Sequence, residues 1–220
     1  MKKLQVIILL GKSGCGKGTQ AKLLQKKFNL DYIGSGDLLR ARGKQNDFTG
    51  KKINEIMVKG ALHPTAVIFK LWLDNAELLK KKKNLKGFIM DGNPRKILEA
   101  YLIDSALGWY EWDKNVKIFL VHISDKEAIW RLTKRRMCKD CKMLIPFVGE
   151  FRKVTKCPKC GGQLVKRADD TLKSAQNRMK WFKTDVQPII NYYRKTGRLI
   201  KINGEQPIEN VFQDILKHLK

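Results

Sequence analysis

The sequence lacks any run of the roughly 20 apolar residues that a transmembrane helix requires, so we expect no membrane partner. The apolar run near its start, residues 6–10, is short. It leads into a glycine- and lysine-rich stretch instead of the small residues of a signal-peptide cleavage site. We therefore expect a cytoplasmic protein. Cysteines number only five, and in a reducing compartment they favour a metal site over disulfides.

Acidic residues are scarce. The 21 Asp and Glu stand against 46 Lys and Arg, which gives a formal charge of +25 on 220 residues. This imbalance favours acidic partners such as nucleotides or nucleic acid. Part of it has a simpler interpretation, because the four lysines at 80–83 are typical of a solvated helix end. With 43% hydrophobic residues, the chain suits one globular unit with a small inserted domain.

Apolar segments typical of buried strands alternate with segments of helical periodicity. We expect strands at residues 6–10, 87–90, 116–123 and 199–202. We expect helices at residues 19–28, 96–107, 126–137, 171–195 and 208–219. This alternation predicts a doubly wound α/β sheet that binds ligands at the carboxyl ends of its strands, where Gly11, Asp91 and Asp125 lie.

Two stretches interrupt the alternation. Residues 34–84 have the pattern of several short helices in succession, whereas residues 138–166 contain Cys, Gly and Pro and little helical signal. We therefore expect a core domain formed by residues 1–33, 85–137 and 167–220. The helical insert occupies residues 34–84, and a small β module occupies residues 138–166.

The stretch GKSGCGKGTQ, residues 11–20, is close to the phosphate-loop pattern G-x-x-x-x-G-K-[ST]. Gly11, Gly16 and Lys17 fit this pattern, but Gly18 takes the Ser/Thr position and the hydroxyl follows as Thr19. Glycines let backbone N–H groups surround phosphate oxygens at the start of a helix, and the lysine reaches the β- and γ-phosphates. By itself the motif indicates only a nucleoside triphosphate.

Two C-x-x-C pairs are separated by fifteen residues, and this spacing indicates a structural metal site. The four ligands are Cys138, Cys141, Cys157 and Cys160. Zinc is the expected ion, and iron is its main competitor. Four thiolates leave no open coordination position, so the metal stabilises a module that is too small to hold its shape alone.

Further motifs are similar to those of one known family. These are IGSGDLLR (residues 33–40), VKGALHP (58–64), GFIMDGNPRK (87–96), the Gly-Thr pair after Lys17, and the four-cysteine module after RLTKRR. Together they resemble the adenylate kinases, in the long form with a zinc-bearing lid, over residues 6–219. The resemblance implies a P-loop NTPase-type doubly wound parallel sheet with a helical acceptor-nucleotide insert and a small zinc-binding β lid. Gly-Thr is the norm in this family, so Gly18 indicates an intact site.

The resemblance also implies a role for each matching residue. Donor (ATP) contacts fall on Gly14, Cys15, Gly16, Lys17, Gly18, Thr19, Arg131, Arg135, Leu144, Ile145 and Gln206. Acceptor (AMP) contacts fall on Ser35, Arg40, Ala61, Leu62, His63, Gly92, Asn93, Pro94, Arg95, Glu99, Arg167 and Arg178. The catalytic charges are Lys17, Arg95, Arg135, Arg167 and Arg178. Asp91 would organise water around Mg²⁺, and Asp170 is expected to orient an arginine through a salt bridge.

Glu99 departs from the family pattern, which has a glutamine that reads adenine at this position. A carboxylate accepts hydrogen bonds but cannot donate to adenine N1. Guanine, with two adjacent donors, would suit a carboxylate better. We therefore hypothesise that the acceptor selectivity is relaxed or shifted from AMP. The alternative is that Glu99 turns toward solvent.

The function that the resemblance implies is the reversible transfer of the ATP γ-phosphoryl group to AMP, which gives two ADP. The cofactors are Mg²⁺ with ATP and a structural Zn²⁺, and a monomer is the family expectation. One alternative is a kinase for another nucleoside monophosphate, GMP, UMP or CMP. Another is a nucleic-acid-associated assembly factor that keeps this fold, suggested by the charge of +25 and the metal module.

Overall fold

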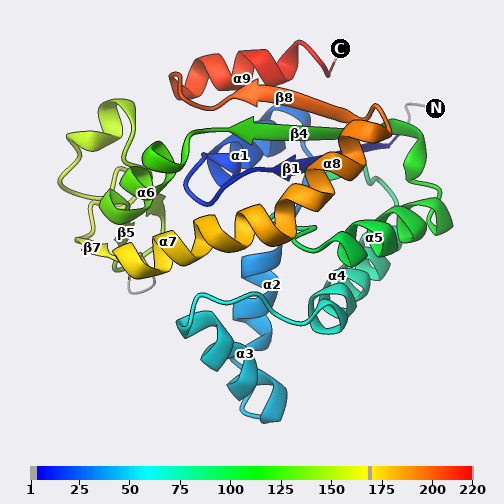
Figure 1. Ribbon diagram of the computed structural model, residues 1–220, viewed down its shortest axis with the longest axis horizontal. Helices are drawn as coiled ribbons and strands as arrows, with labels where there is room; N and C mark the ends of the chain where they lie inside the picture. The colour runs from blue at the N-terminus through cyan, green and yellow to red at the C-terminus, as the bar shows by residue number, and fades with distance from the viewer. Residues whose placement is uncertain (1–3, 168–169, 220) are drawn as a thin grey trace.

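The computed structural model describes residues 4–167 and 170–219, and its centre is a parallel five-stranded sheet in the order β2-β3-β1-β4-β8 (Figure 1). The strands are β1 (Gln5–Leu10), β2 (Asp31–Gly34), β3 (Gly87–Asp91), β4 (Val116–His122) and β8 (Leu199–Asn203). Residues 6–9 of β1 are fully buried, because this strand lies mid-sheet between two layers of helices. The predicted doubly wound α/β fold is confirmed.

Alternate residues of the strands contribute to two cores, one on each face of the sheet. Ile8 packs into one core, and Ile7 and Leu9 pack into the other. The first core is covered by α4 (Thr65–Lys80), α5 (Ile97–Trp109) and α8 (Gln187–Lys195). The second core is covered by α1 (Lys17–Phe28), α6 (Asp125–Lys134), α7 (Leu172–Trp181) and α9 (Ile208–Leu216).

Two smaller units extend from the sheet and its helices (Figure 1). One has its own small core of Leu39, Ile53 and Ile68, contributed by α2 (Ser35–Arg42), α3 (Phe48–Val58) and α4. The other is an antiparallel sheet of β5 (Arg136–Cys138), β6 (Leu144–Ile145) and β7 (Leu164–Lys166), with the short helix η2 (Gly149–Arg152). None of the described helices is long and apolar enough to cross a bilayer.

The structure differs from the predicted elements in three places. The sequence does not predict β2, because Asp31–Gly34 is short and only partly apolar; pairing with β3 makes it a strand. The helix expected at residues 126–137 ends at Lys134, because the backbone from Arg136 onward pairs with β6 and β7. The helix expected at 171–195 is divided into α7 and α8 by the π-helical segment η3 (Phe182–Val186).

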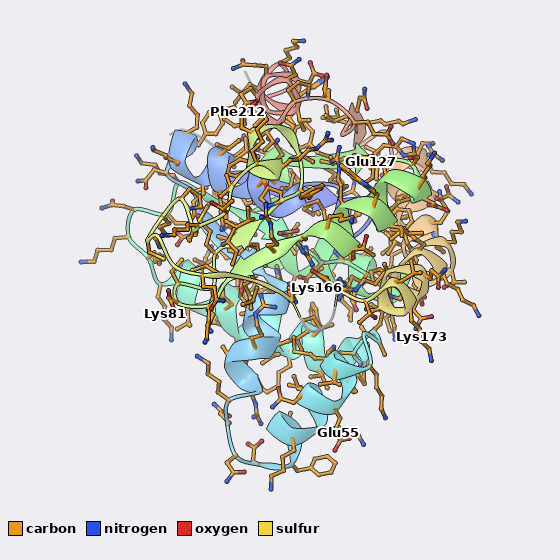
Figure 2. The ribbon with its side chains drawn as sticks, turned by 90° about the vertical axis from the view of Figure 1, so that its left-hand side faces the viewer. Glu55, Lys81, Glu127, Lys166, Lys173 and Phe212 are labelled. Carbon is orange, nitrogen blue, oxygen red and sulfur yellow. The ribbon has the colours of Figure 1, made fainter. Side chains whose placement is uncertain are left out.

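The excess lysines are spread over the surface. All four lysines at residues 80–83 are exposed, at the end of α4. Lys166 and Lys173 are likewise exposed, on the other side of the view from Lys81 (Figure 2).

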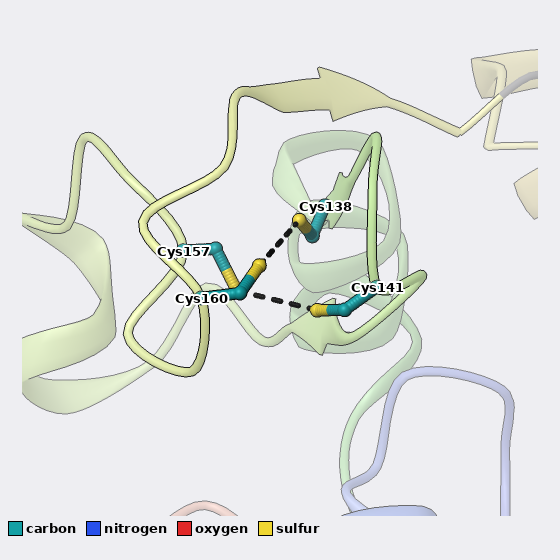
Figure 3. Close-up of side chains that lie close together, drawn as sticks. All are labelled: Cys138, Cys141, Cys157 and Cys160. Carbon is teal, nitrogen blue, oxygen red and sulfur yellow. Dashed lines mark hydrogen bonds between the residues drawn. The ribbon is translucent and has the colours of Figure 1, made fainter.

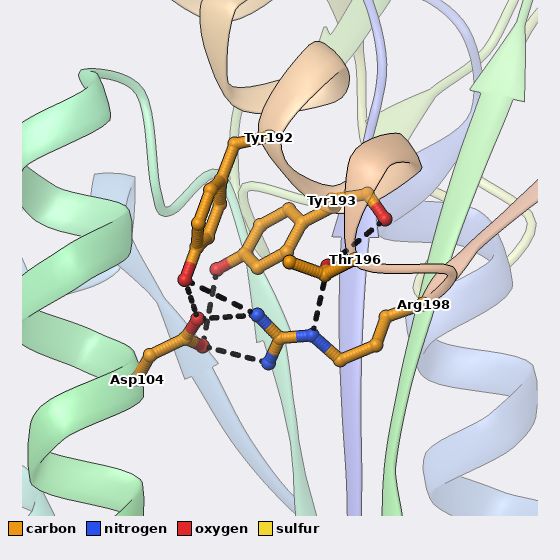
Figure 4. Close-up of polar contacts among 5 residues, drawn as sticks. All are labelled: Asp104, Tyr192, Tyr193, Thr196 and Arg198. Atoms are coloured by element: carbon orange, nitrogen blue, oxygen red, sulfur yellow. Dashed lines mark hydrogen bonds and ion pairs between the residues drawn. The ribbon is translucent and has the colours of Figure 1, made fainter.

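An ion pair fixes α5 to α8 and the start of β8 (Figure 4). Arg198 donates two hydrogen bonds to the carboxylate of Asp104, at 2.6 and 3.2 Å. The Tyr192 hydroxyl donates to the same carboxylate at 2.8 Å. The guanidinium lies over the rings of Tyr192 and Tyr193. With the Asp104 side chain only 17% exposed, water weakens this pair less than it weakens a surface pair.

We expect Asp104→Ala to lower the free energy of unfolding by about 2–3 kcal/mol, because it leaves a partly buried guanidinium and a tyrosine hydroxyl without their partner. Urea denaturation measures the change. Asp74→Ala is the matched control: Asp74 pairs with Lys70 at 2.7 Å, but their side chains are 57% and 73% exposed. The free energy of unfolding of Asp74→Ala should fall by less than about 0.5 kcal/mol. Equal decreases in the two variants would contradict the role given to the Asp104 pair.

Candidate active site

The phosphate-loop pattern forms a turn between β1 and α1 that only glycines allow. Gly11, Gly14 and Gly16 have φ values of 142°, 87° and 100°. Residues that carry a side chain rarely adopt these backbone angles. A Cβ at Gly11 would also lie 2.4 Å from the carbonyl oxygen of Val121. Nothing lies within 4 Å of the Cβ position of Gly16, just before the first turn of α1. The loop therefore exposes backbone N–H groups where a helix dipole attracts anions.

Lys17 is the first residue of α1, and its side chain lies across this loop. Its ammonium donates to the carbonyl oxygens of Gly11 at 2.7 Å and Lys12 at 2.9 Å. Cys15 is buried, with its Sγ 3.5 Å from the same nitrogen. Thr19 lies in the first turn, where its backbone N–H donates to the Gly16 carbonyl. The predicted loop residues are thus grouped around one ammonium.

The geometry explains why glycine occupies position 18. A Cβ there would lie 3.3 Å from Oδ2 of Asp91, which ends β3. A serine or threonine would crowd this carboxylate, so the hydroxyl at Thr19 is compatible with an acid beside the loop. Tyr32 donates to the same oxygen at 3.1 Å. Burial, followed by the Asp91 charge, raises the pKa of Tyr32 far above its usual range, so the hydroxyl stays protonated. Sequence reasoning missed Tyr32.

Three of the predicted acceptor contacts, Ser35, Gly92 and Arg95, lie together. The Gly92 carbonyl accepts from Ser35 Oγ at 2.9 Å and from Arg95 Nε at 2.7 Å. Gly92 has φ 84°, and a Cβ there would lie 2.5 Å from Ser35 Oγ. Asn93 is buried, and its Oδ1 has no hydrogen-bond partner among the described residues; a cis peptide bond joins Asn93 to Pro94.

Several arginines converge on Arg95. Burial lowers the pKa of Arg95, the carboxylates of Asp91 and Glu99 oppose this change, and the cations of Arg178 and Arg40 lower the pKa further. Arg40 itself pairs with Asp37, one turn earlier on α2. The Arg95 guanidinium also lies over the ring of Trp181, 5.6 Å from its centroid. Cations from three separate stretches thus act on one another where an anionic ligand would relieve their repulsion.

The segment after α3 lies beside α7. A Cβ at Gly60 would be 3.0 Å from Ser174 Oγ, a buried hydroxyl that has no hydrogen-bond partner within residues 4–167 and 170–219. His63 is buried, with Nε2 3.2 Å from the Ile53 carbonyl. Ala61 is exposed and Leu62 is half-buried. The predicted acceptor contacts at 61–63 are thus close to the helix that carries Arg178.

Glu99 does not turn toward solvent. Its residue is only 4% exposed, and Oε2 accepts a hydrogen bond from the Arg95 backbone N–H at 2.7 Å. Burial raises the pKa of Glu99, and the Arg95 N–H and guanidinium oppose this change. The solvent alternative is therefore wrong: the carboxyl caps the start of α5 from inside the protein.

Asp170 joins two of the predicted arginines. Its side chain is fully buried, and its carboxylate accepts from Arg135 at 2.7 and 2.8 Å and from Arg178 at 3.3 Å. Its backbone N–H donates to the Arg167 carbonyl. The expected orienting role of Asp170 is confirmed, and it extends to two arginines. Ala168 and Asp169 of the same motif lie outside the described residues.

A pocket of about 460 Å³, here called the lid-side pocket, lies between α6, η2 and the loop after β8. It is lined by Ser124, Lys126, Glu127, Trp130, Arg152 and Glu205. The Arg152 guanidinium stacks on Trp130 at 4.7 Å. Trp130, Arg152 and Glu205 were missed from the sequence, although a tryptophan beside a predicted nucleotide contact was an available signal.

Two of the predicted donor-base residues, Arg131 and Gln206, are chain neighbours of residues that line this pocket. Arg131 follows Trp130 and pairs with Glu127 at 2.6 Å. Gln206 follows Glu205 and donates to Asn203 and Asp214. Leu144 and Ile145 form β6, where Ile145 is fully buried. The pocket brings together the α6 and β8 ends of the predicted donor site.

The four cysteines of the small sheet converge (Figure 3). Their Sγ atoms all lie within 4.8 Å of one another, and the Cys138–Cys160 and Cys141–Cys157 pairs are 3.5 Å apart. Tetrahedral zinc with Zn–S bonds of about 2.3 Å places its sulfurs about 3.8 Å apart. The cluster therefore fits a Cys₄ zinc site, as predicted.

The chain is similar to known proteins over nearly its whole length. Residues 9–198 match the sequence model of the family described as Adenylate kinase. Relatives with this name include one from Methanothrix thermoacetophila, 37% identical over 97% of both chains. A relative from Chlamydia muridarum is 37% identical over 97% of this chain and 86% of its own. Another from Archaeoglobus fulgidus is 36% identical over 95% of both.

We expect the purified protein to contain one zinc ion per chain, measured by elemental analysis. Removing it with a strong chelator should lower the melting temperature by several degrees, because the small sheet has little apolar core of its own. Cys141→Ser should lose the metal. Cys15→Ser, which changes the cysteine outside the cluster, should keep it. An unchanged melting curve after confirmed metal removal would contradict the structural role.

Proposed function

Because the chain belongs to the adenylate kinase family, we propose that the grouped residues of this site transfer the γ-phosphoryl group of ATP to AMP, giving two ADP. The observation that carries this proposal is the convergence of cations. Lys17 lies at the phosphate loop, Arg95 lies within electrostatic range of Arg40 and Arg178, and Asp170 holds Arg178 beside Arg135.

We assign the donor triphosphate to the loop and Lys17, because this is where backbone N–H groups and a helix N-terminus face outward. We assign the donor base to the lid-side pocket. The acceptor phosphate falls to Arg40 and Arg95, which come from α2 and from the end of β3 and so approach it from two sides. Arg135, Arg167 and Arg178 would act on the phosphoryl group in transit. This division makes residues 34–84 the acceptor unit and 138–166 the lid.

The chemistry requires positioning and charge neutralisation more than proton transfer, since the acceptor phosphate is already anionic at neutral pH. Lys17 and the arginines stabilise negative charge on the moving group. Mg²⁺, which adenylate kinases use with ATP, would add to this neutralisation, and Asp91 beside the loop provides the carboxylate oxygens that Mg²⁺ prefers. Closure of the lid would exclude water, the competing acceptor. We further propose a cytoplasmic monomer.

Lys17→Ala and Arg95→Ala should each lower kcat/KM at least about a hundredfold, the scale of a lost charge-stabilising contact. A coupled assay of ADP formation measures this. Lys22→Ala is the matched control for Lys17, because Lys22 lies on the same helix with its side chain exposed. The kcat/KM of this variant should stay within twofold of the wild-type value. Near-normal turnover of either site variant, with its melting temperature unchanged, would remove that residue from the catalytic set.

Glu99 fits adenine when it is neutral. A protonated carboxyl has one donor and one acceptor, as an amide does, so it matches adenine N1 and the N6 amino group. Its Oε2 accepts from Arg95 N–H and keeps a second lone pair. Burial favours the neutral form, because it raises the pKa of Glu99. This state reconciles an acidic residue with AMP as acceptor.

We therefore expect kcat/KM for AMP to fall as pH rises through the raised pKa of Glu99, because the ionised carboxyl no longer donates to N1. Glu99→Gln should remove this fall and raise kcat/KM for AMP about tenfold at the alkaline end. GMP, assayed in parallel, should show the opposite pH trend in the wild type. A flat AMP profile in the wild type would contradict a titrating Glu99.

A further inference from the structure

A second pocket, here called the rear pocket, lies at the carboxyl ends of β4 and β8, beneath η3 and α8. Its volume is about 430 Å³, and it shares no lining residue with the lid-side pocket. Its walls include four permanent cations, Lys12, Lys183, Arg194 and Lys201. A volume in this range suits a small molecule rather than a polymer.

Positive charge in the rear pocket exceeds the negative charge available to it. Asp125 is the acidic lining residue, and its two oxygens are divided between Lys12 and Lys183, each at 2.7 Å. Within residues 4–167 and 170–219, no carboxylate lies at ion-pair distance from Lys201 or Arg194. The pocket thus carries a formal excess of three positive charges, an arrangement that an anion would stabilise.

His122 reports on this excess from inside the pocket. Burial lowers its pKa, and the cations of Lys201 and Lys12 lower it further, while the more weakly acting carboxylates of Glu205 and Asp125 raise it. Bound anions would therefore raise the pKa of His122. This histidine plays no part in the phosphoryl-transfer site described above.

The floor of the rear pocket strengthens binding of a charged group. Leu120, Phe182 and Ile190 close it from below, each no more than 6% exposed. An apolar floor lowers the local dielectric constant, so cations above it attract an anion more strongly than they would on an open surface. Arg194 adds a planar fork that suits phosphate oxygens.

Lys12 connects the rear pocket to the phosphate loop. Its side chain pairs with Asp125 and donates to the Ile123 carbonyl at 2.7 Å, while its own backbone carbonyl accepts from the ammonium of Lys17. An anion that competes with Asp125 for Lys12 would shift the same residue that supports Lys17.

We propose that the rear pocket is a second anion site, which takes a small phosphorylated metabolite and transmits its binding to the phosphate loop through Lys12. The site itself rests on the cavity and its charges. Only the consequence for ATP binding rests on the proposed function. Backbone phosphates of RNA share the ligand chemistry, but a cavity of about 430 Å³ with an apolar floor favours the small molecule.

The test follows the His122 ring by NMR at constant ionic strength, with the phosphate loop filled by a non-transferable ATP analogue and AMP. Inorganic pyrophosphate is the probe, and a short single-stranded RNA at equal phosphate concentration is the second arm. We expect pyrophosphate to raise the His122 pKa by about half a unit or more and to shift the Lys12 backbone amide. His122→Gln identifies the signal.

Two variants with the same change in net charge decide the location. R194Q/K201Q should weaken pyrophosphate binding at least fivefold. K81Q/K83Q, which removes two exposed lysines that are not among the lining residues of the rear pocket, should not weaken it. Equal responses of the two variants, or no response of His122 in the wild type, would overturn the site.

A response to RNA alone would overturn the small-molecule class. A shift of His122 without any shift of Lys12 would overturn the connection to the loop. Kinase activity enters none of these readouts.

Discussion

The buried carboxylate of Asp170 is the interaction on which the arrangement of the cleft depends. Arginines repel one another, and a cluster of them does not assemble in a partly dry site without a counter-charge. Asp170 supplies this charge and faces both Arg135, at the end of α6, and Arg178, on α7. One acidic group therefore fixes the relative positions of two cationic side chains from separate elements.

The parallel sheet brings the remaining groups to the same edge. The phosphate loop follows β1, Asp91 ends β3, and Ser35 follows β2 directly. These strands are neighbours in the order β2-β3-β1, so their carboxyl ends are adjacent. Figure 1 shows the small sheet beyond this edge, on the left, and α2 and α3 extending downward from the rest of the molecule. Residues far apart in the chain thus form one site because the strand order places their elements side by side.

Sequence reasoning identified features governed by local rules. The glycines of the loop, the spacing of the four cysteines and the salt bridge of Asp170 each depend on a short motif, and the structure has all three. β2 was missed because its four residues become a strand only by pairing with β3. Trp130, Arg152 and Glu205 were missed because their pocket is formed by three separate elements. Arg198 and Asp104 are 94 residues apart, and no local pattern relates them.

The fastening of α5 has a consequence for how the acceptor base is discriminated. The helix is held at Asp104, past its middle, by a guanidinium and a tyrosine from α8 and the start of β8, while at its first turn the carboxyl of Glu99 accepts from the Arg95 amide. The contacts at Asp104 oppose sliding or rotation of the helix, and the Arg95 amide fixes the carboxyl of Glu99. A nucleobase bound at Glu99, as proposed above, would therefore meet a surface that shifts little, on which a mismatched edge costs its full desolvation penalty.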